Sequence, residues 1–249
     1  MQTEKLQKVL AQLGLGSRRH IEQWILQGRI RVNHSLAKLG DRVDIYAAIE
    51  LDGRPVRRGS ESTFRRRVLL YHKPAGVLCT RHDLEGRPLV FDQLPAIKAQ
   101  RWILVGRLDL NTSGLLLVSN EGSLVHRLLH PSYEIEREYA VRVLGRVTEQ
   151  MLTRLCNGVH LEDGWASFTT IHDRGGSGVN HWYHVILKEG RNHAVHRLWA
   201  SVGVTVSRLI RIRFGSISLP QDLPRGRWRE LTAEQISSLE KILYSDGRV

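Results

Sequence analysis

The spacing of apolar residues near the N-terminus predicts two helices followed by short strands. Between residues 6 and 13 the apolar positions recur at i, i+3, i+4 and i+7, and Gly14 can end this helix in the left-handed region. Ser17 is placed to cap a second helix. Segment 29–33 alternates basic and apolar residues at strand period, and Asp52-Gly53 is typical of a hairpin turn. This part of the chain therefore describes a compact module of helices and short strands.

Beyond residue 67 the pattern changes to apolar runs of strand length with fewer helical segments between them. Strands are predicted at residues 68–73, 102–105, 114–119, 137–143, 182–187 and 207–215. Helices are predicted at 123–129, 149–156, 191–201 and 233–243, the second capped by Thr148 and the last by a Thr232 and Gln235 capping box. Because strands outnumber helices without alternating regularly with them, an α+β domain on a mixed, largely antiparallel sheet is favoured over a doubly wound one.

Charge is unevenly distributed between the two parts of the chain. The expected domains are residues 1–60 and 61–249, and the polar segment 57–67 is typical of a linker, although its arginines could instead begin a strand with a basic face. The formal net charge is +12, and residues 1–67 hold 14 Lys and Arg against 7 Asp and Glu. This balance favours a polyanionic partner, nucleic acid above all, over an anionic membrane surface or simple solubility.

Arg18 and Arg19 are the basic residues of the N-terminal module that most favour phosphate binding. Both fall in the first turn of the second predicted helix, where the helix dipole disfavours cations unless an external anion approaches the same end. We therefore expect this pair to contact nucleic-acid phosphates. A solvated basic turn is the alternative.

The sequence argues against several classes of protein. Cys79 and Cys156 are too few for a disulfide framework or a zinc site, and neither belongs to a CxxC pair. The 12 histidines show no metal-ligand spacing, and no glycine-rich nucleotide-binding motif follows a strand. No export signal or membrane span is evident. We expect a cytoplasmic protein without a metal, a nucleotide cofactor or a membrane attachment.

The run from Gly106 to Gly122, GRLDLNTSGLLLVSNEG, carries the strongest candidate for chemistry. Asp109 lies between two apolar strands, on a turn that the polar residues 111–113 can fix by local hydrogen bonds. In a strand-like segment Arg107 would point the same way as Asp109 and keep its carboxylate ionised, which suits a nucleophile or a base. The alternative is a pair of Arg and Asp that only buttresses a loop.

Two further segments supply aromatic and basic side chains. In REYAVRV, Tyr139 shares a strand face with Arg137, and it is either a core aromatic or a platform on which a base stacks. EGRNHAVHRL leads from a glycine-containing turn into a helix whose basic residues are Arg191, His193, His196 and Arg197. These residues could pair with a carboxylate or hold a phosphate, and packed or solvated positions are the alternative.

The two parts of the chain resemble two known families. Residues 4 to about 60, with EKLQKVLAQLGLGSRRHIEQWILQGRIRVN and the later GDRV, resemble the S4 RNA-binding domain, which implies docking on folded RNA. The remainder resembles the RsuA family of pseudouridine synthases, and within it the type that acts on large-subunit rRNA. The likeness rests on YHKPAGVLCT, EGRPLVFDQLP, GRLDLNTSGLLLVSNEG, REYAVRV, EGRN with HRLW, VSRLIRIRFG and LPRGRW, which follow one another in family order.

That resemblance implies isomerisation of a uridine in 23S rRNA, or in a pre-ribosomal large-subunit particle, by a monomer that needs no cofactor. The target base must first leave the helix stack. Asp109 corresponds to the family's essential aspartate, which attacks or deprotonates the nucleoside, and Tyr139 to the tyrosine that stacks on the flipped base. Arg107 adjoins the catalytic loop. The residues expected to bind the substrate are Arg18, Arg19, Arg191, His196 and Arg197.

One departure from the family pattern concerns the basic helix. Where the family usually reads EGRNRxVRRL, this chain has EGRNHAVHRL, so His193 and His196 replace arginines. Position 196 matches the basic residue that commonly pairs with the catalytic aspartate, and imidazole is mostly neutral near pH 7. Either His196 acts in its charged form, or Arg197 or Arg107 compensates, or catalysis is weakened. In the last case the chain is an rRNA-binding or ribosome-assembly protein on the same fold.

Overall fold

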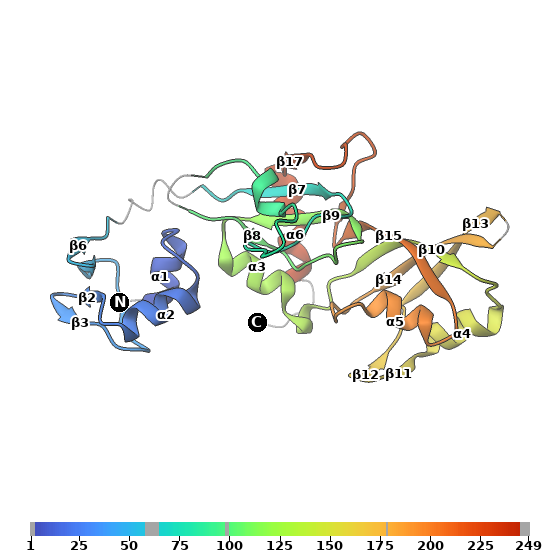
Figure 1. The fold of residues 1–249 in the computed structure, drawn as a ribbon, viewed down its shortest axis with the longest axis horizontal. Coiled ribbons are helices and arrows are strands. Elements are labelled where there is room, and N and C mark those ends of the chain that lie inside the picture. The colour runs from blue at the N-terminus through green and yellow to red at the C-terminus, as the bar shows by residue number, and fades with distance from the viewer. Residues whose placement is uncertain (1–2, 58–64, 98–99, 178, 245–249) are drawn as a thin grey trace. The chain divides into compact units, whose positions relative to one another are not determined.

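The computed structural model describes residues 3–57, 65–97, 100–177 and 179–244, and the chain forms two compact units (Figure 1). The first unit contains residues 1–66 with the segments 95–102 and 120–122, and the second contains the remainder. Most of the predicted linker, residues 58–64, lies outside the described residues. Each unit has a hydrophobic core of its own.

The first unit is built on the two predicted helices. Helix α1 spans Leu6–Gln12 and helix α2 spans Arg18–Leu26, where the Ser17 hydroxyl accepts a hydrogen bond from the His20 amide at 3.0 Å. The apolar stripe that predicted α1 packs into the core of this unit. The predicted Asp52-Gly53 turn is also present, since both residues have positive φ between two antiparallel strands.

The strands of the first unit are short and antiparallel. Four of them form a sheet in the order β3, β2, β5 and β6, and β1 pairs separately with β4. Their bounds are β1 Glu4–Lys5, β2 Ile30–Val32, β3 Ser35–Leu36, β4 Arg42–Val43, β5 Ile49–Leu51 and β6 Arg54–Pro55. Arg18 and Arg19 are exposed at the start of α2.

The second unit is organised around a nine-stranded sheet. Its strands follow the order β13, β14, β10, β15, β9, β7 and β17, with β16 pairing on β15 and β8 on β9. All of these pairs are antiparallel except β15 with β9, so the predicted mixed, largely antiparallel sheet is confirmed. The bounds are β7 Val68–Lys73, β8 Ile103–Leu104, β9 Ser113–Ser119, β10 Arg137–Leu144, β13 Thr170–Ser177, β14 Asn180–Leu187, β15 Thr205–Phe214, β16 Ile217–Ser218 and β17 Trp228–Glu230.

The predicted helices after β9 are present, and one of them is shorter than expected. The Thr148 hydroxyl accepts a hydrogen bond from the Met151 amide at 3.3 Å, which confirms that cap, and Thr232 and Gln235 form the reciprocal bonds of a capping box. Helix α5 begins at Ala194 rather than Arg191, because His193 adopts a left-handed conformation with φ of 51°. The helices are α3 Gly122–Leu129, α4 Glu149–Asn157, α5 Ala194–Ala200 and α6 Ala233–Tyr244, beside the 3₁₀ turns Val90–Gln93 and Pro131–Tyr133 and the hairpin of β11 Val159–Leu161 with β12 Gly164–Ala166.

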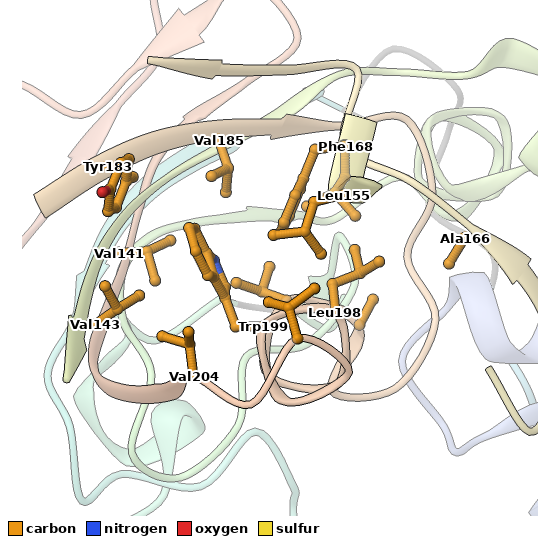
Figure 2. Close-up of a cluster of buried hydrophobic side chains, with 14 of the residues drawn as sticks. Val141, Val143, Leu155, Ala166, Phe168, Tyr183, Val185, Leu198, Trp199 and Val204 are labelled. Carbon is orange, nitrogen blue, oxygen red and sulfur yellow. The ribbon is translucent and has the colours of Figure 1, made fainter. Parts of the chain in front are cut away.

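Two hydrophobic clusters pack against the sheet of the second unit. One joins β10, β14 and β15 to α4 and α5, and the fully buried Trp199 of α5 lies there with its ring centroid 5.1 Å from that of Tyr183 (Figure 2). The other joins β7 and β9 to α3 and α6. Strand β15 contributes to both clusters, through Leu209 to the first and Phe214 to the second. It therefore connects the two halves of the sheet.

The parallel pairing of β9 with β15 depends on a glycine. Gly114 lies opposite Arg211 with φ of 109°, a value that residues with a Cβ rarely adopt. A Cβ at this position would overlap the backbone carbonyl of Arg211 and lie 2.7 Å from the backbone nitrogen of the same residue. Glycine thus permits the close approach that carries the end of the loop 106–112 against β15.

Several strands of the structure were not predicted from the sequence pattern. The residues of β13, TIHDRGGS, include Asp and Gly types that are typical of turns, and the strand lies at the edge of the sheet with most side chains exposed. Its register with β14 shifts between Asp173 and Gly176, as at a β-bulge. Strands β11, β12, β16 and β17 have only two or three residues, too few for a visible alternation. Pairing, rather than local pattern, defines all of these strands.

We expect Gly114→Ala to destabilise the protein more than the matched change Gly76→Ala. Both glycines have positive φ, so each substitution carries a conformational cost of about 1 kcal/mol. At Gly76 nothing lies within 4 Å of the added Cβ, whereas at Gly114 the overlap with backbone adds about 1–3 kcal/mol. Equilibrium urea unfolding measures both losses in the free energy of unfolding. Equal losses would contradict the importance of the close approach.

Candidate active site

A buried lysine holds the loop that carries Asp109. Lys73 ends β7 and is fully buried, and its ammonium donates hydrogen bonds to the backbone carbonyls of Pro74, Asp109, Leu110 and Thr112 at 2.8–3.3 Å. Burial lowers the pKa of Lys73, whereas the nearby Cys79 thiol and Asp109 carboxyl act to raise it. An ammonium that is buried this deeply depends on its acceptors, so the lysine and the loop backbone fix one another.

The loop itself differs from the sequence expectation in two ways. The buried Thr112 hydroxyl, which was expected to fix the turn, has no hydrogen-bond partner in the described part of the chain. Residues 106–109 form no strand, and Arg107 and Asp109 are not joined by an ion pair among the described residues. Asp109 instead faces His193, whose Nε2 lies 3.5 Å from the carboxylate Oδ1.

A cleft of about 1520 Å³ opens around Asp109 within the second unit. Its lining includes Arg107 and Asp109 from the loop, Tyr139 from β10, and His193 and His196 at the start of α5. The fold therefore brings together candidates from three separate segments of the sequence. The Asp109 side chain is 33% exposed, so its carboxylate is accessible to a bound molecule. The volume exceeds that of a typical small-ligand site and suits a segment of a polymer.

Tyr139 lies on the wall of the cleft, on a strand that pairs with a neighbour on each side. Its backbone pairs with Val185 of β14 and with Arg211 of β15. The ring packs partly against the hydrophobic core and also lines the cleft. The two interpretations of this residue, a core aromatic and a stacking platform, are therefore compatible in one position.

The arginines around α5 are engaged with carboxylates. Arg191 lines the cleft, and its Nε donates to the Glu189 carboxylate at 2.6 Å. Arg197 donates two hydrogen bonds of 2.8 Å to the carboxylate of Asp163, in the turn between β11 and β12, and it is not among the residues that line the cleft. This bidentate pair ties α5 to the β11 and β12 hairpin.

His196 is the basic residue whose charge depends most on its surroundings. Burial lowers the pKa of His196, and Asp109 nearby acts in the opposite direction. Its Nδ1 is buried and has no hydrogen-bond partner among the described residues. The imidazole of His196 is therefore mostly neutral at neutral pH, beside a carboxylate whose Oδ1 lies 3.5 Å from Nε2 of His193.

Three side chains with metal-ligating atoms meet at this point, although the sequence shows no metal-ligand spacing. Asp109, His193 and His196 each place one oxygen or nitrogen atom within 4.8 Å of the other two. Spacing along the chain could not reveal this set, because the aspartate belongs to a loop far earlier in the sequence than the helix.

Buried basic residues around the cleft also went unrecognised in the sequence. Arg211 is 2% exposed, and its Nε donates to the Leu115 carbonyl at 2.7 Å. Arg137 is similarly buried and donates to the Lys188 carbonyl at 2.9 Å. Both line the cleft. The available signal was a charged residue inside an apolar strand, which requires a specific partner, and Lys73 at the end of VLLYHK gives the same signal.

Comparison with known proteins identifies the family. The model of the RNA pseudouridylate synthase family matches residues 67–201, and the model of the S4 domain matches residues 4–45. The chain belongs to the RsuA family of pseudouridine synthases. A relative from Pseudomonas aeruginosa, named ribosomal large subunit pseudouridine synthase B, is 56% identical over 239 residues, which cover 96% of this chain and 62% of the relative. A relative of the same name from Escherichia coli strain K12 is 56% identical over 245 residues, which cover 97% of this chain and 84% of the relative.

A solved structure described as a pseudouridylate synthase shares the fold. It superposes with a TM-score of 0.66 over 94% of this chain and 99% of that chain, at 24% sequence identity. The predicted order of an S4 domain followed by a pseudouridine synthase fold is thus confirmed. Among the described residues, no helix combines the length and the apolar character that crossing a membrane requires.

We expect Lys73→Met to lower the free energy of unfolding by about 1–3 kcal/mol or more, because the carbonyls around the ammonium would lose their donor while remaining buried. Chemical denaturation measures this loss. The matched control is Lys241→Met, which removes an exposed lysine near the end of α6 and should change stability by less than about 0.5 kcal/mol. Equal stability of the two variants would show that Lys73 does not hold the loop.

Proposed function

We propose that this protein isomerises a specific uridine of large-subunit (23S) ribosomal RNA to pseudouridine, as a cytoplasmic monomer that requires no cofactor. The observation that carries the proposal is the position of Asp109. The aspartate of the GRLDxxTxG motif lies partly exposed in a polymer-sized cleft, on a loop whose backbone Lys73 holds. The names of the relatives support the choice of large-subunit RNA.

The proposed reaction exchanges one glycosidic bond for another. The bond between the ribose C1′ and uracil N1 breaks, the uracil turns, and its C5 joins C1′; the C5 proton is then lost and N1 takes up a proton, so substrate and product are isomers. Asp109 starts this sequence as nucleophile or base, and the flipped uracil stacks on Tyr139, which we propose also takes part in the later proton removal. Arg107, exposed beside the catalytic loop, supplies positive charge for the phosphates that flank the flipped nucleotide.

The remaining basic candidates are proposed to bind the RNA in two places. Arg18 and Arg19, exposed in the first turn of α2, contact backbone phosphates through the S4 domain, with the domain boundary near residue 60. Arg191 and His196 line the cleft and face the target nucleotide. The bidentate pair of Arg197 with Asp163 supports a role for this arginine in positioning α5 for substrate binding.

We expect Asp109→Asn to reduce isomerisation by more than about 1000-fold while RNA binding is retained, because the amide preserves the shape of the side chain but cannot act as a nucleophile or base. Tritium release from large-subunit rRNA labelled at uracil C5 measures turnover, and filter binding measures RNA affinity. Asp222→Asn, at an exposed aspartate paired with Arg229, is the matched control and should keep full activity.

Retained tritium release in Asp109→Asn would show that Asp109 is not the nucleophile or base of the reaction. A separate test addresses the substrate: pseudouridines are mapped in ribosomal RNA from cells with and without the gene. Loss of one site from the large-subunit RNA is the expected result. An unchanged map would contradict the proposed substrate.

We expect His196→Arg to keep or raise the turnover of the wild-type protein. The substitution places a permanent positive charge near Asp109, where burial now keeps the imidazole mostly neutral. The comparison is of kcat in the tritium-release assay, with His160→Arg on the exposed side of β11 as the control for an added guanidinium. A large loss in His196→Arg alone would show that the histidine has a function that arginine cannot provide.

A further inference from the structure

A cluster of three side chains beside the loop has the composition of a metal site: Asp109, His193 and His196. One carboxylate oxygen and one nitrogen from each imidazole lie within 4.8 Å of one another. Two imidazoles and a carboxylate form a ligand set that binds Zn²⁺ and neighbouring transition metals, whereas Mg²⁺ and Ca²⁺ prefer oxygen ligands throughout. The chemistry of the three groups therefore selects a borderline-soft divalent cation.

The distances suit such an ion. A tetrahedral zinc ion with bonds of about 2.0–2.1 Å holds its ligand atoms about 3.3–3.5 Å apart. The Nε2 of His193 is already 3.5 Å from Oδ1 of Asp109, and the two imidazole rings have centroids 5.8 Å apart. The ligand atom of His196 lies within 4.8 Å of both of these atoms, so all three are near the spacing that one ion requires.

The surroundings hold two of the ligands in place and leave access for an ion. Lys73 fixes the backbone at Asp109, and His196 lies on α5 with a buried Nδ1 that has no hydrogen-bond partner among the described residues. The His193 side chain is 50% exposed, and all three residues line the same open cleft. An ion can therefore enter from solvent, and water can complete its coordination.

We propose that Asp109, His193 and His196 bind one divalent transition-metal ion, with Zn²⁺ as the best-suited species, and that the bound ion blocks the active site. A carboxylate that ligates a metal cannot attack or deprotonate a nucleoside, and the ion occupies the space in which the target nucleotide is expected. The inhibitory part of this proposal rests on the proposed function, whereas the binding part does not. The protein is then sensitive to free zinc through its own two histidines.

The binding part is tested with untagged full-length protein and Co²⁺ as a spectroscopic probe. One equivalent of Co²⁺ should produce visible absorption typical of tetrahedral nitrogen and oxygen ligation, and Zn²⁺ should displace it with the same stoichiometry in isothermal titration calorimetry. His193→Arg and His196→Arg should each weaken the binding by more than about 100-fold, because each loses a ligand and adds a positive charge. His160→Arg should bind like the wild type.

Two results would overturn the metal site. One is the absence of 1:1 binding, or binding that both arginine variants retain. The other is a near-ultraviolet thiolate-to-cobalt band, which would place the ion on a cysteine such as Cys79, another residue of the cleft lining.

The inhibitory part is tested by adding Zn²⁺ to the tritium-release assay. Wild-type turnover should fall as the calorimetric site fills, and a chelator or a higher RNA concentration should restore it. The activity of His196→Arg, expressed relative to its own rate without zinc, should need at least about 100-fold more Zn²⁺ for half inhibition. Full wild-type turnover with the site occupied would overturn the inhibitory part and contradict the proposed role of Asp109. The metal site itself would still be supported by the binding data. Absence of binding in an active enzyme would overturn only the metal site.

Discussion

One buried ammonium determines where the carboxylate of this site can lie. Lys73 reaches from the end of β7 to the backbone carbonyls of residues on either side of the turn that carries Asp109. An ammonium in a dry environment is tolerated only while its acceptors stay in place, so movement of the loop would expose an unsatisfied charge. The position of Asp109 is therefore set by the core of the sheet more than by the residues of the loop.

The far end of the same loop is held by the sheet. Gly114 allows β9 to approach β15, and Arg211, the residue opposite that glycine, is also the β15 partner of Tyr139 on β10. A continuous path of paired backbone thus runs from the loop of Asp109 to the tyrosine on the other wall of the cleft. Because backbone pairing is stiff, this path constrains the separation of the carboxylate and the ring.

The local sequence pattern was sufficient to predict elements that have a clear periodicity or a capping residue. The strand 68–73 has the predicted bounds, and the caps at Thr148 and Thr232 form the expected hydrogen bonds. Strand β13 was missed, because it is a strand only through its pairing with β14. Helix α5 was predicted but begins later than expected, because His193 has a left-handed backbone. The site divides in the same way. The family resemblance indicated Asp109 and a basic residue at position 196 beside it, whereas the anchor at Lys73 and the contact of Asp109 with His193 were not indicated before the fold was known.

The two histidines beside Asp109 change what determines the charge of the site. A guanidinium at position 196 would stay positive under all ordinary conditions, whereas the pKa of His196 is lowered by burial, and a neutral imidazole adds no net charge. Permanent positive charge around the carboxylate must then come from the other cleft residues, Arg107 and the buried Arg137 and Arg211 among them. The same neutrality leaves nitrogen lone pairs free to ligate a metal ion, which no guanidinium offers. Histidine at position 196 is thus an electrostatic partner whose charge depends on pH, where arginine would be a permanently charged one.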